Sequence, residues 1–115
     1  MTDLLNIPSL TELKGLLGDE LFAITGMFAE QLQVDLAAIE ALHSAQDHPV
    51  LAKRAHAVKG SSGNMGAQAL SRLAAELETA ALARDDAALV RLVTALPALA
   101  ADSLAEMRRQ GFLQS

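Results

Sequence analysis

Apolar residues recur along most of the chain at spacings of three and four, which is the pattern of amphipathic helices. Turn signals divide this pattern into five segments. In the first, residues 8–18, Ser9 is placed as an N-cap, Glu12 follows three residues later as its capping-box partner, and Gly18 stands at the end. This segment is predicted to form a short opening helix.

The second segment, residues 19–44, carries an apolar stripe along one face. Its members are Leu21, Ile24, Phe28, Leu32, Leu36, Ile39 and Leu42. The sequence AQDHP ends this helix, and Pro49 suits the first turn of the next, where its missing N–H costs no hydrogen bond. We expect this third helix to end between Gly63 and Gly66.

Two more helices complete the pattern. Residues 67–83 place Leu70, Leu73 and Leu77 on one face, up to a turn at 84–86. The last helix, residues 86–110, has an apolar seam at Leu89, Val93, Leu96, Leu104 and Met107. Pro97 lies inside it and predicts a kink, because proline removes a hydrogen bond and crowds the preceding turn. The elements predict an all-α fold over residues 1–115, a single-domain antiparallel four-helix bundle with a short additional N-terminal helix across one end.

Composition narrows the classes of function. The 115 residues suffice for one domain, and the absence of cysteine excludes disulfides and thiolate metal sites. A net charge of −5 argues against nucleic acid as the main partner, because phosphate contacts need a basic surface. No basic leader and no uncharged span of eighteen apolar residues is present, so neither secretion nor membrane insertion is predicted. We expect a cytoplasmic protein.

The third helix contains the stretch AHAVKGSSGNMGA, residues 55–67, which is rich in glycine and serine. At 100° per residue, one face forms a buried stripe of Leu51, Ala55, Val58, Ser62 and Met65. His56 points almost the opposite way. Its neighbours on that face are small or flexible: Ala52, Lys53, Lys59, Gly60 and Gly63. An exposed helical glycine costs about 1 kcal/mol relative to alanine, so Gly60 indicates that something external needs room beside the imidazole.

A phosphoryl group is the chemistry that fits such a surface. A neutral imidazole nitrogen can take a phosphoryl group from an acyl phosphate and return it, with little assistance beyond alignment and charge neutralisation. The ammonium of Lys59, one turn from His56, could lie against the phosphoryl oxygens. Gly60 would let another protein's active-site edge approach the helix.

Residues 55–78, AHAVKGSSGNMGAQALSRLAAELE, resemble the signature of histidine-containing phosphotransfer (HPt) domains: His-x-x-Lys-Gly, a run of small residues, a glycine, and a Leu-rich helix ending in Leu-Glu. The resemblance implies that His56 is phosphorylated, that Lys59 steadies the phosphoryl group and that Gly60 clears space for docking. Its secondary positions are Gly63, Ser61, Ser62, the turn glycine Gly66, and Glu78, where some members carry a glutamine that bonds the histidine. A carboxylate at Glu78 would orient the ring if it reached it; we favour the alternative, that it points into solvent.

The resemblance further implies a phosphocarrier that relays phosphoryl groups between aspartates of response-regulator receiver domains, supplied by a hybrid sensor histidine kinase. Such domains lack ATP binding and autokinase activity, and GSSGNMG is accordingly not followed by a phosphate-binding Lys-Ser or Lys-Thr pair. No cofactor is expected on this chain, because the magnesium would belong to the receiver. A monomer is expected, since the site must stay open.

Two other functions remain open: a scaffold or antagonist that only binds receivers, and a phosphoacceptor module of a larger chemotaxis-type kinase. A histidine-kinase dimerisation domain is disfavoured, because no His-Glu-x-x-x-Pro box follows His56. The Glu-x-x-His pattern at Glu40 and His43 has no second copy, so a di-iron site is not predicted. Docking should use surplus apolar residues near His56, drawn from Leu10, Leu13, Leu16, Leu17, Ala23, Met27, Ala37 and Ala38.

Overall fold

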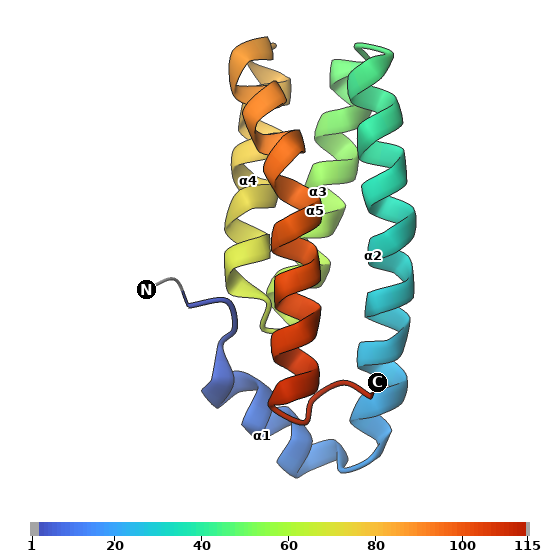
Figure 1. The fold of residues 1–115 in the computed structure, drawn as a ribbon, viewed down its shortest axis with the longest axis vertical. Helices are drawn as coiled ribbons and strands as arrows, with labels where there is room; N and C mark the ends of the chain where they lie inside the picture. The colour runs from blue at the N-terminus through green and yellow to red at the C-terminus, as the bar shows by residue number, and fades with distance from the viewer. Residues whose placement is uncertain (1–2, 115) are drawn as a thin grey trace.

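The computed structural model describes residues 3–114 and contains five helices in that range, which form an antiparallel four-helix bundle with the first helix lying across one end (Figure 1). Their bounds are α1 Ile7–Leu17, α2 Glu20–Ser44, α3 His48–Asn64, α4 Gln68–Leu82 and α5 Asp86–Arg109. The predicted all-α bundle is confirmed. Its helix boundaries lie within about two residues of those that the apolar pattern indicates.

Side-chain caps begin three of the helices. The carboxylates of Asp47 and Asp85 accept hydrogen bonds from the backbone three residues on, at the starts of α3 and α5. The predicted capping box of Ser9 and Glu12 is wrong: α1 starts two residues before Ser9, whose N–H donates to the side chain of Asn6 at 3.2 Å. Asn6 therefore caps α1, and Pro8 lies in the first turn of this helix.

The core follows the predicted stripes with one exception on α2. Leu21, Phe28, Leu32 and Ile39 are buried, whereas Ile24 is 39% exposed and the next residue, Thr25, is fully buried. The Thr25 hydroxyl donates to the carbonyl of Phe112 at 2.8 Å, so the C-terminal segment covers this position of α2. The three-and-four spacing of apolar residues could not predict that Thr25 is buried, because the residues that cover it lie at the far end of the chain.

A buried ion pair joins α2 to α3. Asp35 is 5% exposed, and its carboxylate accepts hydrogen bonds from Arg54 at 2.9 Å and from Gln31 at 3.0 Å. A buried carboxylate is tolerated because it is paired and hydrogen-bonded. This contact fixes the two helices against each other about half a turn from His56.

The turn between α3 and α4 requires glycine. Gly66 has φ +70°, and a Cβ there would lie 2.8 Å from the side chain of Leu10. Its carbonyl accepts a hydrogen bond from the N–H of Asn6 at 2.7 Å. The turn therefore also anchors α1 across the end of the bundle, which confirms the position predicted for Gly66.

Helix α5 continues through Pro97 without interruption. The helix is long and apolar enough to cross a membrane by length and composition alone, with a mean hydropathy of 1.5 over an 18-residue window. Helices in the cores of soluble proteins meet the same criterion. In the bundle, Leu89, Leu92 and Leu96 of α5 are buried among the residues of the common core.

Candidate functional site

His56 lies near the middle of α3 and points out of the bundle, as predicted. Its side chain is 65% exposed, whereas Ala55 and Val58 on the opposite face are fully buried. An imidazole in this position is accessible to a partner protein.

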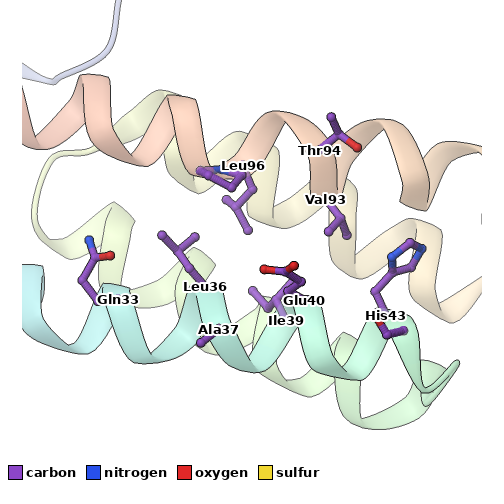
Figure 2. Close-up of a pocket in the computed structure, with 11 residues that line it drawn as sticks. Gln33, Leu36, Ala37, Ile39, Glu40, His43, Val93, Thr94 and Leu96 are labelled. Atoms are coloured by element: carbon purple, nitrogen blue, oxygen red, sulfur yellow. The ribbon is translucent and has the colours of Figure 1, made fainter.

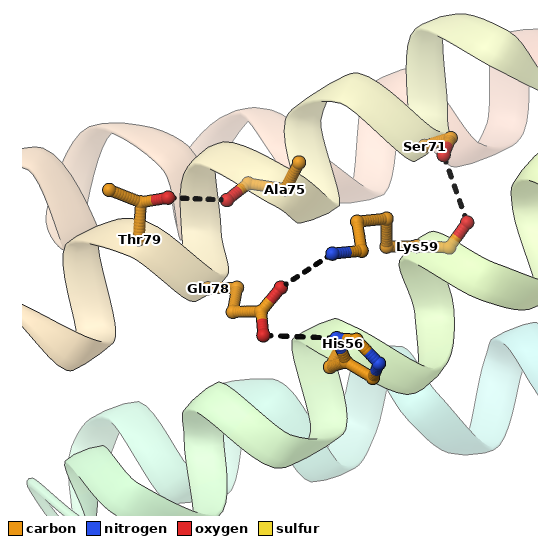
Figure 3. A network of polar contacts seen from close by, with 6 residues as sticks. All are labelled: His56, Lys59, Ser71, Ala75, Glu78 and Thr79. Atoms are coloured by element: carbon orange, nitrogen blue, oxygen red, sulfur yellow. Dashed lines mark hydrogen bonds and ion pairs between the residues drawn. The ribbon is translucent and has the colours of Figure 1, made fainter.

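Glu78 on α4 reaches both His56 and Lys59 (Figure 3). One carboxylate oxygen, Oε2, lies 3.0 Å from Nδ1 of His56, and the other, Oε1, accepts a hydrogen bond from the Lys59 ammonium at 3.0 Å. The interpretation that Glu78 points into solvent is therefore wrong. The carboxylate bridges the two side chains that the HPt signature singles out.

This bridge determines how the imidazole is oriented. The hydrogen bond from Lys59, together with the positive charge around the site, lowers the pKa of Glu78. An ionised carboxylate only accepts hydrogen bonds, so Nδ1 of His56 must carry the proton that it donates. In the neutral imidazole the lone pair then lies on Nε2, and Figure 3 shows that this second nitrogen points away from Glu78.

Close packing of α3 on α4 brings Glu78 within reach. Small residues line this contact, and a Cβ built on Gly63 would lie only 3.4 Å from the hydroxyl of Ser71. That hydroxyl donates to the backbone carbonyl of Lys59 at 2.9 Å, which ties the site directly to α4. Gly63 thus faces α4, and Ala52, a small neighbour of His56 on the same helix, is only 4% exposed.

Gly60 leaves open space on the surface, in contrast to Gly63. A Cβ at Gly60 would have no non-neighbouring atom of residues 3–114 within 4 Å. The fold itself therefore does not require glycine at this position. That this space serves the docking of a partner stays a prediction.

The two serines after Gly60 play different structural parts. Ser61 is half-buried toward α2, and its hydroxyl donates to the carbonyl of Val58 at 3.3 Å. Ser62 is fully buried, and within residues 3–114 its hydroxyl has no hydrogen-bond partner. Both therefore pack behind the site and neither presents its hydroxyl beside the imidazole.

Three apolar side chains of α2 are exposed, and two of them, Ile24 and Met27, lie next to α3. Ile24, Met27 and Val34 are 39%, 70% and 57% exposed. A groove of about 380 Å³ lies between these helices, the α2–α3 groove, lined by Ile24, Met27, Phe28, Gln31, Ser61, Asn64 and Met65. Sequence reasoning selected Met27 and missed Ile24 and Val34, since it assigned Ile24 to the core.

The docking candidates predicted on α1 differ in how far they are exposed. Leu10 is fully buried under the α3–α4 turn, and Leu13 and Leu17 pack partly against the core. Leu16 is 76% exposed, but it belongs to α1 at the end of the bundle. Among the helix-α1 candidates, none therefore joins the surface around His56.

A hollow of about 550 Å³ lies between α2 and α5 and contains neither His56 nor its neighbours (Figure 2). Glu40 and His43 line it together with apolar residues such as Leu36 and Val93. Residues 3–114 contain no group of three or more histidine, cysteine, aspartate or glutamate residues that could hold a metal ion.

A family model described as Hpt domain matches residues 23–109, which include α3, α4, α5 and nearly all of α2. No curated protein and no solved structure matches the chain significantly.

Proposed function

Because the chain belongs to the Hpt domain family, we propose that it relays a phosphoryl group between receiver-domain aspartates through His56. An Hpt domain is a phosphotransfer module of two-component signalling, a phosphocarrier and not a kinase. The observation that carries the proposal for this chain is the bridge from Glu78 to His56 and Lys59, which leaves the His56 side chain 65% exposed.

Transfer begins when Nε2 of His56 attacks the phosphorus of an aspartyl phosphate on the donor receiver. The N–P bond forms as the P–O bond to the aspartate breaks, and the carboxylate leaves with the electron pair. The proton on Nδ1 stays in its hydrogen bond to Glu78, whose negative charge compensates the cationic phosphoimidazole. The reverse step on a second receiver restores the neutral ring.

Lys59 is placed to neutralise the phosphoryl oxygens. Its ammonium lies 3.0 Å from Glu78 and its side chain is 37% exposed, so it can exchange this contact for one to an incoming phosphoryl group. A lysine ammonium suits this exchange because it is a compact charge on a flexible stem. Magnesium and the remaining catalytic groups belong to the receiver, and this chain needs neither a cofactor nor ATP.

The receiver docks over the α2–α3 groove. The exposed apolar residues of this groove, Ile24 and Met27, lie across from Ser61, the residue that follows Gly60 in the sequence. An apolar patch with a polar rim is typical of transient interfaces. We propose that the protein acts as a monomer, because association through this surface would cover the site. Hpt domains are typically soluble, and the cytoplasm is the compartment that we propose.

The test is phosphotransfer from a panel of receiver domains already phosphorylated on aspartate, with wild-type protein and the His56→Gln variant. We expect acid-labile, alkali-stable label on the wild type only, with fast transfer from few receivers. Tight receiver binding without label would favour the scaffold. Label from a kinase domain but from no receiver would favour the kinase module.

A further inference from the structure

A second groove opens directly beside the histidine, on the opposite side from the α2–α3 groove. It has a volume of about 380 Å³ and lies between α3 and α4. Its lining, which defines the α3–α4 groove, consists of Pro49, Ala52, Lys53, His56, Glu78 and Leu82. His56 is thus itself part of the wall of this groove.

Leu82, the last residue of α4, is an apolar side chain that the fold leaves uncovered. It is 69% exposed, although Ala81 next to it is almost fully buried. It follows Glu78 by four positions, so the two side chains lie one helical turn apart on the same face. Since Glu78 contacts Nδ1 of His56, Leu82 lies about one turn beyond the reacting imidazole.

Charge in the groove also points to a protein partner. Lys53 is exposed at the rim of the groove, and within residues 3–114 its ammonium forms no ion pair. The charge of Lys59, in contrast, is paired with that of Glu78. The free charge of the groove is therefore positive. An occupant with an apolar tip and a neighbouring carboxylate would complement both features.

We propose that the α3–α4 groove receives an apolar side chain of the receiver domain during phosphotransfer, with Leu82 as the contact that selects the partner. This inference rests on the proposed function. A receiver aspartate that reaches Nε2 of His56 must cover the mouth of the groove, because His56 forms its wall. The receiver then contacts α3 on both sides, over the α2–α3 groove and over the α3–α4 groove, and the second contact strengthens docking of the matching receiver.

The test compares Leu82→Ser with Val90→Ser in phosphotransfer from the receiver that labels the wild type fastest. Val90 is a matched control, since it is 54% exposed on α5, which within residues 3–114 packs against α4 and α2 but not against α3. Neither side chain belongs to the core, so both variants should fold, as circular dichroism would verify. A milder Leu82→Ala variant provides a second measurement if Leu82→Ser unfolds.

We expect the Leu82 variant to lower the second-order rate constant of transfer about tenfold, the scale of an interface anchor. The single-turnover rate at saturating receiver should stay unchanged, because Leu82 does not touch the phosphoryl group, and Val90→Ser should match the wild type. Equal rate constants for Leu82→Ser, Leu82→Ala and wild type would overturn the groove proposal alone. A wild-type protein that no phosphorylated receiver labels would overturn the relay and, with it, this inference.

Discussion

The carboxylate of Glu78 lies 3.0 Å from Nδ1 of His56, across the contact between α4 and α3. Because a carboxylate is a pure acceptor, this contact assigns the proton to Nδ1 and the lone pair to Nε2. The same carboxylate holds Lys59 beside the ring. Glu78 of α4 thus positions both α3 side chains that the HPt signature singles out.

Removing the Glu78 side chain should slow phosphotransfer without preventing phosphorylation. In Glu78→Ala the imidazole loses its acceptor and can present either nitrogen, so we expect the single-turnover rate to fall on the order of tenfold through lost alignment. Glu78→Gln keeps an acceptor oxygen for Nδ1 and should retain most of the rate. Rapid-quench measurements with one receiver check both variants. Equal rates for Glu78→Ala and wild type would show that the bridge has no part in transfer.

The lowered pKa of Glu78 predicts a pH dependence of stability. A carboxyl group whose pKa is lower in the folded than in the unfolded protein stabilises the fold above its unfolded value of 4.5, and this contribution is lost as pH falls through the folded value. Wild type should therefore be more stable than Glu78→Gln at pH 6, with the difference shrinking below about pH 4.5. Urea unfolding at a series of pH values measures it. A difference that grows on acidification would contradict the assigned sign.

The Gly60→Ala variant should be more stable than the wild type but slower in phosphotransfer. Alanine meets no atom within 4 Å at this position and is the better helix former, so the free energy of unfolding should rise by up to about 1 kcal/mol. Transfer from a receiver should nevertheless slow, by about tenfold if the added methyl group overpacks the docked interface.

Gly15→Ala is the matched control for that variant. Gly15 also lies in a helix with open space around it, but on α1 at the end of the bundle. It should stabilise the protein without changing the transfer rate. Unimpaired transfer by Gly60→Ala would show that docking does not use the clearance beside His56.

The ion pair of Asp35 and Arg54 should contribute to the free energy of unfolding, because the carboxylate of Asp35 is buried and needs a partner. In Arg54→Met the buried carboxylate keeps only its bond from Gln31, so we expect a loss of about 1–3 kcal/mol in the free energy of unfolding. Arg91→Met, at an exposed position of α5, should stay within about 0.5 kcal/mol of wild type. Chemical denaturation compares the two. A similar small effect for both would mean that solvent screens the pair.

Helix positions could be predicted from the sequence because local spacing determines them. The apolar stripes and the turn signals placed all five helices, and the glycines around His56 marked the exposed face of α3. The errors arose where distant residues cover a position. Thr25 is buried because Phe112 returns to α2, and Asn6 replaced Ser9 as the cap of α1 because the chain enters the helix earlier than the apolar pattern begins.

The bridge from Glu78 depends on the distance between two helices, and no motif within either helix encodes that distance. His56 and Glu78 are 22 residues apart in the chain. A signal was nevertheless present, because alanines and glycines recur on the faces that α3 and α4 turn toward each other. Small residues allow close helix approach, and read together they would have predicted that a glutamate on α4 reaches α3.

The most direct test of the account is to locate the phosphoryl group on the protein after transfer from a receiver. Long-range ¹H–¹⁵N spectra of the imidazole, combined with ³¹P detection, distinguish the two ring nitrogens of His56. The bridge from Glu78 predicts a phosphoryl group on Nε2, with the proton retained on Nδ1. A phosphoryl group on Nδ1, or on any residue other than His56, would contradict it.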